Sequence, residues 1–398
     1  MKNRIYFLDN LRTFLIFLVV LYHSALVYQI GLESNWIVSD PVKSESMGLI
    51  GMYLDVFVMF ILFFISGYFM PLSLNNKNDW GFIKSKAKRI LLPWLIAVFT
   101  LIPLYKIIFL YSRGLPQEEW FSYFHFFERA GADLNFFANN PLQHWLWYLP
   151  VLFLFQIIYL GLSKTKLLSI NISMKTAVIS IFVVALIYSS VVSLYGLKGW
   201  YHSSILHFQR ERLLVYFMIF LLGSLSYKLR IFDSESRNKK LYIFSNVMLT
   251  LGLTFYTIIA LNLFFNLVYP DRNYYFISTT IDRIAYYAFM LISMFSFLHI
   301  IIDAFRFKLN KSNALMSMVN KSSYYVYIIH MVLIGGIALI LLDLAIPTFI
   351  KFIMLTLLSF TISNLIVLAY YKYVKQYLIL KIAILIASGI SLFIIISS

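Results

Sequence analysis

Long apolar segments alternate with short polar ones along almost the entire chain. A helix that crosses a bilayer needs roughly 20 mostly apolar residues. We therefore predict ten transmembrane helices, near residues 12–31, 48–70, 88–110, 145–162, 175–195, 212–228, 241–266, 280–303, 320–342 and 349–371. An eleventh, near 378–397, is interrupted by Lys381. The pattern predicts an all-α integral membrane protein: a polytopic bundle of ten core helices over residues 1–375, with an extra C-terminal helix in 376–398.

The composition supports this fold class. Of the 398 residues, 61% are hydrophobic and 13% are charged, whereas soluble domains are nearer half apolar and a quarter charged. The chain has no cysteine, which excludes disulfides, thiolate metal ligands and a cysteine nucleophile. The histidines are too scattered to form a sequence-local metal site, so no metal is expected.

The formal net charge of +16 is distributed unevenly between the connections. Counted from the N-terminus, alternate connections carry 23 Lys and Arg residues in total, and the remaining connections carry nine. Because basic residues concentrate on the cytoplasmic side of a membrane, the N-terminus is predicted to be cytoplasmic. The basic excess is a topology signal that also attracts anionic lipid headgroups, and it does not imply nucleic acid.

The first predicted span contains RTFLIFLVVLYH, in which Arg12 and His23 enclose ten uncharged residues. Eleven residues at 1.5 Å each place the two about 16 Å apart along a helix and, after nearly three turns, on nearly the same face. Ionisable residues inside a membrane are costly and suggest function. The alternative is that Arg12 is an interfacial topology residue and His23 a buried, hydrogen-bonded histidine.

Two other polar residues are predicted at a similar depth. Asp55 lies seven residues into the second span and is the candidate partner of His23, because a neighbouring carboxylate fixes the imidazole tautomer and stabilises its protonated form. Alternatively, Asp55 lines an aqueous vestibule or pairs with another polar residue. His330, in SSYYVYIIHMVLI, is either a second histidine at the substrate or a buried, hydrogen-bonded core residue.

A basic cluster, KSKAKRILLPW, stands at the predicted cytoplasmic mouth of the third span. Lys86, Lys88 and Arg89 are suited to hold a polyphosphate, although such clusters also set topology. Arg12 is predicted to lie at the same cytoplasmic face of the membrane. Ser66, in FFISGYF near the cytoplasmic end of the second span, allows close helix packing or a break in the helix, and we include it among the donor-binding candidates.

Candidate acceptor-binding residues are predicted at the outer ends of spans. In QHWLWYLP, His144, Trp145 and Trp147 form either an interfacial aromatic anchor or a sugar-stacking surface. Arg210 and Glu211 either neutralise neighbouring charges or hydrogen-bond a polar acceptor. The long connection 111–144 is predicted to form a partly structured cap.

Five segments occur in the order found in the membrane-bound acyltransferase 3 family: RIYFLDNLRTFLIFLVVLYHSA, FFISGYF, SKAKRILLPW, QHWLWYLP and SSYYVYIIHM. The chain resembles this family from Arg4 to about Lys375, and it is most similar to the glucan-modifying branch, the periplasmic glucan succinyltransferase type. The arginine-x10-histidine spacing, on Arg12 and His23, is the most characteristic of these motifs.

The resemblance implies a ten-helix core that transfers an acyl group from cytoplasmic acyl-CoA, acetyl-CoA or succinyl-CoA, to an extracytoplasmic acceptor. It implies that His23 is catalytic and that Arg12 and Arg89 contact the donor. The family's arginine-x-x-arginine motif is here Lys86-Ala-Lys-Arg89, so only Arg89 carries over cleanly, and lysine binds phosphate without a bidentate fork.

We therefore expect an O-acyltransferase of the bacterial cytoplasmic membrane that acts on a hydroxyl of a glycan or lipid-linked sugar. His23 would deprotonate that hydroxyl or form a transient acyl-imidazole. A transporter or flippase for a glycan or lipid is the alternative, because many spans and intramembrane ionisable residues fit it equally well. Homo-oligomerisation is left open.

Overall fold

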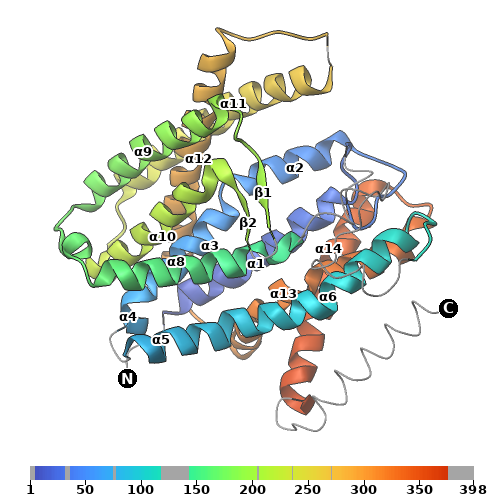
Figure 1. The fold of residues 1–398 in the computed structure, drawn as a ribbon, viewed down its shortest axis with the longest axis horizontal. Helices are drawn as coiled ribbons and strands as arrows, with labels where there is room; N and C mark the ends of the chain where they lie inside the picture. Colours follow the sequence, from blue (N-terminus) through green and yellow to red (C-terminus); the bar gives the residue numbers. More distant parts are fainter. Residues whose placement is uncertain are drawn as a thin grey trace.

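The computed structural model describes residues 5–374, apart from 32–35, 75–77, 118–142, 204–205, 235 and 270. The α-helices are α1 (Tyr6–Leu26), α2 (Glu45–Asp55), α3 (Val58–Tyr68), α4 (Met70–Leu74), α5 (Asp79–Lys86), α6 (Leu92–Tyr111), α8 (Tyr148–Ser163), α9 (Met174–Leu194), α10 (Leu213–Lys228), α11 (Lys239–Val268), α12 (Thr279–Lys308), α13 (Ala314–Leu342) and α14 (Thr348–Ala369). Shorter 3-10 or π turns are η1 (Ala87–Leu91), η3 (His144–Trp147), η4 (Lys166–Ser169), η5 (Arg210–Arg212), η6 (Ile231–Asp233) and η7 (Tyr370–Val374). The strands β1 (Trp200–His202) and β2 (His207–Gln209) form an antiparallel hairpin between α9 and α10 (Figure 1).

Nine helical segments of the described chain are long and apolar enough to cross a membrane. They coincide with nine of the ten predicted core spans. The other prediction, 212–228, is α10, a helix of 16 residues, which is shorter than the roughly 20 needed for a full crossing. The predicted eleventh helix, 378–397, lies outside the described residues. The all-α polytopic class is confirmed, and the side of the N-terminus stays a prediction.

Two predicted spans are interrupted. The second breaks after Asp55, and α3 restarts at Val58. The third is continuous from Asp79 to Tyr111 but contains the π-helical turn η1. Interruptions of this kind re-aim side chains, and π-turns within α-helices are frequent at functional sites.

Polar side chains define where many of the helices begin. Ser173, Asn238, Ser278 and Asn313 each precede a long helix and accept a hydrogen bond from the backbone N–H three residues later. Such N-caps satisfy one of the free amide groups at a helix start. The beginnings of α9, α11, α12 and α13 are therefore determined by local sequence.

Glycines allow α3 and α10 to cross in close contact. A Cβ placed on Gly67 would lie 1.8 Å from the carbonyl oxygen of Phe220, and one on Gly223 would lie 2.0 Å from that of Phe64. No side chain fits at either position. The small residues predicted in the second span thus serve close helix packing.

Helix α1 lies in the middle of the bundle, where α13 packs along it and α2, α3, α12 and α14 contact it (Figure 1). Buried amides join α1 to α13. The Asn320 amide donates to Asn10 Oδ1 at 2.8 Å, and Thr13 Oγ1 donates to Asn320 Oδ1 at 2.6 Å. Because unsatisfied buried polar groups are costly, this network holds the register of the two helices that carry the candidate site.

Candidate active site

Two histidines from different helices meet between α1 and α13. His23 Nδ1 is 2.9 Å from His330 Nε2, and the imidazole rings stack with centroids 5.0 Å apart. His330 lies near the middle of α13, 16 residues after its first residue. The predicted position of His330 at the depth of His23 is therefore confirmed, and the two side chains are in direct contact.

The hydrogen bonds of the pair define its tautomers. His330 Nδ1 is 2.7 Å from the carbonyl oxygen of Tyr327. A carbonyl oxygen only accepts, so His330 Nδ1 carries the hydrogen. With one proton on each ring, His330 Nε2 then accepts from His23 Nδ1, and the lone pair of His23 is on Nε2.

His23 is the more accessible of the two rings. His330 is fully buried, whereas His23 is half-buried. The Trp36 indole stacks on the His23 ring with centroids 5.6 Å apart and planes at 21°, and the Tyr22 ring meets it edge-on at 5.1 Å. These contacts restrict rotation of the imidazole and leave His23 as the member of the pair that a substrate can reach.

Asp55 is not the partner that was predicted for His23. Its Oδ2 is 2.6 Å from Arg212 Nη1, which is also 3.2 Å from the backbone carbonyl oxygen of Asp55. The carboxylate pairs with a guanidinium because α2 ends at Asp55 and η5 brings Arg212 beside that end. The expected carboxylate–imidazole pair is thus replaced by an imidazole–imidazole pair.

The tryptophans of η3 are packing residues. Trp145 and Trp147 are both buried. The Trp145 indole Nε1 donates to the Ile328 carbonyl oxygen at 2.8 Å, and the Tyr327 hydroxyl donates to the Trp145 carbonyl oxygen. Trp147 packs on Phe63. Neither ring is free to stack on a sugar, which corrects the predicted acceptor role, but Trp145 positions the turn of α13 that precedes His330.

His144 also lies within the bundle. Its ring stacks on the Tyr105 ring at a centroid distance of 4.1 Å. The residue adopts a positive φ of 43°, which is uncommon for a residue other than glycine. The predicted acceptor role of His144 stays a prediction.

Arg12 and His23, predicted from their spacing to share one face of the helix, both contact α13. Arg12 Nη2 is 3.3 Å from Asp9 Oδ1 and 3.5 Å from the Asn320 carbonyl oxygen. The Arg12 side chain is 39% exposed, so its ion pair with Asp9 contributes only about 0.5 kcal/mol. Among the described residues, its buried Nε has no hydrogen-bond partner. The guanidinium is therefore available to an anionic ligand.

Other donor-binding candidates lie close to Arg12. The Ser66 hydroxyl is 2.8 Å from the Tyr148 hydroxyl, and the charge of Arg12 lies close enough to interact with the same phenol. The Tyr324 phenol interacts electrostatically with both Tyr148 and Arg89. The Ser66–Tyr148 hydrogen bond and these electrostatic interactions place Arg12, Ser66 and Arg89, which were predicted separately along the sequence, in one neighbourhood.

The π-turn η1 has a specific cause. Pro93 has no N–H to donate to the carbonyl four residues earlier and clashes with it. That carbonyl belongs to Arg89, and it accepts instead from the Tyr324 hydroxyl at 2.9 Å. The side chains of Lys88 and Arg89 are exposed, and neither forms an ion pair or hydrogen bond with the described part of the chain. Lys86 donates to Ser73 Oγ at 3.2 Å.

Arg210 and Glu211 stabilise the hairpin region. Glu211 Oε2 accepts from the Gly199 backbone N–H at 2.8 Å, and Arg210 lies 5.7 Å from the Tyr201 ring centroid. Their predicted role in acceptor binding stays a prediction. The predicted cap over 111–144 lies mostly outside the described residues.

The hairpin contains a second pair of histidines. His202 and His207 are opposite each other in the β1–β2 register, and the His207 ring also stacks on Trp200 at 4.4 Å. Burial, followed by the nearby His202, lowers the pKa of His207 to about 3. Burial, followed by the nearby charge of Arg210, also lowers the pKa of His202.

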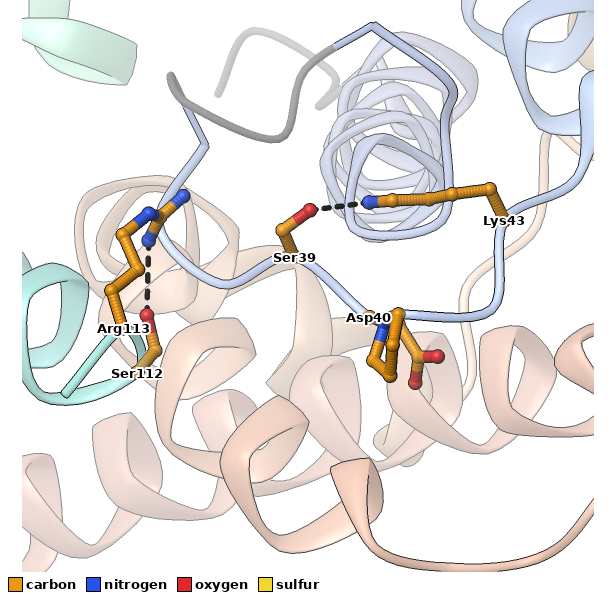
Figure 2. Close-up of a pocket in the computed structure, with 6 residues that line it drawn as sticks. Ser39, Asp40, Lys43, Ser112 and Arg113 are labelled. Carbon is orange, nitrogen blue, oxygen red and sulfur yellow. Dashed lines mark hydrogen bonds between the residues drawn. The ribbon is translucent and has the colours of Figure 1, made fainter.

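A pocket of about 310 Å³ lies where α1 leads into α2 and α6 ends (Figure 2). Lys43 and Arg113 stand on opposite sides of it, each hydrogen-bonded to a serine, Ser39 or Ser112. The Asp40 carboxylate in its wall is 2.9 Å from buried Lys351. Burial lowers the pKa of Arg113 to about 10.

Arg113 connects this pocket to the histidine pair. Its Nη2 donates to the Trp36 carbonyl oxygen at 2.7 Å, and the Trp36 ring stacks on His23. Trp36 and Arg113 were not predicted as site residues. The one available signal was that Arg113 is among the few basic residues in the predicted outer connections. Within the described ranges, no three His, Asp or Glu residues are grouped to hold a metal ion.

A comparison with protein families shows to which family the chain belongs. The family model described as an acyltransferase domain matches residues 5–370, nearly the whole chain. The chain belongs to the acyltransferase 3 family. Both members of the histidine pair, Arg12 and Arg89 all lie within the matched residues.

Relatives within this family support the glucan-modifying branch. The glucans biosynthesis protein C of Salmonella typhi is 29% identical over 162 residues, which are 40% of this chain and 39% of that protein. The proteins of the same name from Salmonella typhimurium and Salmonella paratyphi B match to the same extent. The match thus spans about two fifths of these relatives. No solved structure matches the chain.

Family membership favours the enzyme over the transporter or flippase that the hydrophobic pattern also allowed. The chain is a multi-pass membrane protein of the acyltransferase 3 family.

Proposed function

We propose that this acyltransferase transfers an acyl group, acetyl or succinyl, from cytoplasmic acyl-CoA to a hydroxyl of an extracytoplasmic glycan or lipid-linked sugar. The bacterial cytoplasmic membrane is the proposed location, with the N-terminus in the cytoplasm. The observation that carries the proposal is the pair of hydrogen bonds that joins His23 to His330 and His330 to the Tyr327 carbonyl oxygen. It leaves a lone pair on Nε2 of the accessible ring.

The transfer step follows from this tautomer. His23 Nε2 accepts the proton of the acceptor hydroxyl while the hydroxyl oxygen attacks the thioester carbonyl carbon. A C–O bond forms, the C–S bond breaks, and the proton passes from His23 to the thiolate of CoA. The positive charge on His23 is stabilised through its Nδ1–H bond to His330, in the manner of a base oriented by a second group.

An acyl-imidazole intermediate would use the same nitrogen. Acylation of His23 Nε2 would release CoA first, and the acceptor hydroxyl would then remove the acyl group. Rapid acid quenching after mixing with radiolabelled acyl-CoA, without acceptor, distinguishes the two routes. Label on the protein indicates the intermediate, and its absence with full turnover indicates the general base.

The neighbourhood of Arg12, Ser66 and Arg89 supports binding of the donor. CoA carries phosphates that guanidinium and ammonium groups bind well, and Lys86 and Lys88 lie in the same basic segment. Arg12 and His23 are about 16 Å apart along α1, which is comparable with the length of the pantetheine arm. A donor bound at Arg12 would therefore present its thioester near His23.

The relatives' name supports a glycan acceptor. Those proteins are named for glucan biosynthesis, and a glucan or lipid-linked sugar is accordingly the proposed acceptor here.

Purified protein in detergent tests the donor assignment. We expect CoA and acetyl-CoA or succinyl-CoA to raise the melting temperature, because a ligand that binds only the folded state stabilises it. Arg89→Gln should weaken this shift, whereas Lys240→Gln, which removes an exposed charge on α11, should not. Absence of both stabilisation and acyl transfer would contradict the proposal, and glycan transport without CoA binding would favour a transporter.

A further inference from the structure

Asp55 and Arg212 form an ion pair with unequal exposure. The side chain of Arg212 is 5% exposed and that of Asp55 is 30% exposed. Arg212 contacts both the carboxylate and the backbone carbonyl of Asp55. The guanidinium therefore holds the carboxylate in place from the buried side.

The carboxylate retains hydrogen-bonding capacity. Oδ2 faces Arg212, and Oδ1 of Asp55 makes no hydrogen bond to any residue that the structure describes. A charged group within a membrane-spanning segment faces an aqueous space or a polar partner rather than lipid. The exposed part of Asp55 is therefore expected to contact water or a polar ligand.

Tyrosines from several helices lie near this ion pair. Tyr22 of α1 and Tyr216 of α10 lie close enough to interact electrostatically with both Asp55 and Arg212. Tyr256 of α11 does so as well, and its ring contacts that of Tyr286 on α12 at a centroid distance of 5.2 Å. Tyr216 and Tyr256 are buried, and Tyr22 and Tyr286 are half-buried.

The cluster adjoins the proposed base. Tyr22 interacts electrostatically with Asp55, and its ring meets the His23 ring edge-on at a centroid distance of 5.1 Å. A purely structural ion pair would gain little, because replacing a buried pair by apolar residues is often neutral or stabilising. An accessible carboxylate beside tyrosine rings instead matches what polyhydroxylated ligands need: an acceptor for hydroxyl hydrogens and apolar faces for sugar rings.

We propose that Asp55, held by Arg212, hydrogen-bonds a hydroxyl of the acceptor sugar, with the half-buried Tyr22 ring next to His23, and so presents a neighbouring hydroxyl to His23. Asp55 is a substrate-binding residue here, and Arg212 is its positioning residue. This inference rests on the proposed acyltransferase function and specifies its acceptor site.

Two variants test the inference with a soluble glucose oligosaccharide that the wild-type protein acylates from radiolabelled acyl-CoA. Asp55→Asn keeps the shape but removes the charge. The double variant Asp55→Leu/Arg212→Met removes both charges and leaves neither buried alone. Both should lower kcat/KM for the oligosaccharide about 10- to 100-fold, the range of one hydrogen bond to a charged group. The CoA-induced thermal shift should be unchanged.

Tyr53→Phe is the matched control, since it removes a hydroxyl on the same helix that bonds Thr257 at 2.9 Å. It should keep the wild-type kcat/KM for the oligosaccharide. A wild-type kcat/KM in either folded Asp55 variant would overturn the inference, and Asp55→Asn decides the matter if the double variant does not fold. Failure of the wild-type protein to acylate any oligosaccharide while binding CoA would instead count against the proposed acceptor class.

Discussion

A neutral imidazole acts as a base only at the ring nitrogen that carries no hydrogen. In this protein the choice of nitrogen on His23 is made by His330, whose own tautomer is set by the Tyr327 carbonyl oxygen. The arrangement has the logic of a catalytic triad, in which the third group orients the second, but it contains no carboxylate. His330 is thus expected to be a positioning residue for His23.

We predict that His330→Ala lowers kcat about 100-fold or more, within the range that general base catalysis contributes. His330→Gln should restore part of this activity, because its side-chain oxygen can accept from His23 Nδ1. His299→Ala, which removes a histidine bonded to Ser245 between α11 and α12, is the control and should leave kcat unchanged. Equal kcat for His330→Ala and wild type in steady-state assays would refute this role.

Residue spacing could predict part of this site. Three helical turns between Arg12 and His23 place both on the face toward α13, and depth places His330 opposite. The partner of Asp55 could not be predicted this way, because Arg212 comes from a segment more than 150 residues away and α2 ends at Asp55. Depth along a helix does not determine which of several polar residues at that depth will pair.

At the scale of helices, the close crossing of α3 and α10 depends on two glycines, Gly67 and Gly223, which have no side chain. We predict that Gly67→Ala lowers the melting temperature by several degrees, corresponding to about 1–3 kcal/mol or more for overpacking, because the added methyl group would overlap the Phe220 carbonyl. Gly161→Ala is the matched control, since a Cβ there meets no atom within 4 Å and alanine favours a helix by about 1 kcal/mol over glycine. Thermal unfolding in detergent measures both, and equal effects of the two substitutions would contradict the account.

The β1–β2 hairpin is expected to make the stability of the folded protein depend on pH. Because burial lowers the pKa of His207 to about 3, the unfolded chain binds a proton below its usual pKa of about 6.5 and the folded chain does not. Stability should therefore fall as the pH drops from about 6.5 toward 3, by up to ~1.4 kcal/mol per pH unit. His207→Phe, which keeps an aromatic ring beside Trp200, should show a smaller decrease in melting temperature between pH 7 and pH 5. An identical decrease would show that His207 is not responsible.

Element boundaries were predictable where local chemistry sets them and not elsewhere. N-caps such as Ser278 mark where helices begin. Pro93 has no N–H to donate to the Arg89 carbonyl oxygen, and the Tyr324 hydroxyl donates to it instead, which explains the π-turn. Hydropathy alone did not predict the short length of α10 or the break after Asp55. Asp55, at that break, pairs with Arg212, the residue before α10, and such a tertiary contact is not visible in hydropathy.

At the scale of the whole molecule, the charge distribution predicts a cytoplasmic N-terminus. The absence of cysteine in the chain makes single-cysteine labelling direct. We expect Lys198→Cys, on an exposed connection, to react with a membrane-impermeant maleimide in intact spheroplasts. Lys84→Cys, at an exposed position that the charge pattern predicts to be cytoplasmic, should react only after permeabilisation. The reverse pattern would invert the topology and place the basic mouth outside the cell.

The bundle, the basic neighbourhood and the histidine pair together support the proposed enzyme, in which a cytoplasmic donor would reach a base within the membrane. The buried amides between α1 and α13 hold that base relative to its orienting partner, and the Trp36 ring, whose carbonyl oxygen accepts from Arg113, stacks on it. Acyl transfer is expected to depend most on His23 Nε2.

The most direct test is acyl transfer by the purified His23→Ala variant, with CoA-induced thermal stabilisation as evidence of a folded donor site. We predict wild-type stabilisation by CoA and a loss of acyl transfer of about 10²- to 10⁴-fold, the contribution of a general base. Full transfer activity in a folded His23→Ala protein would contradict the central claim.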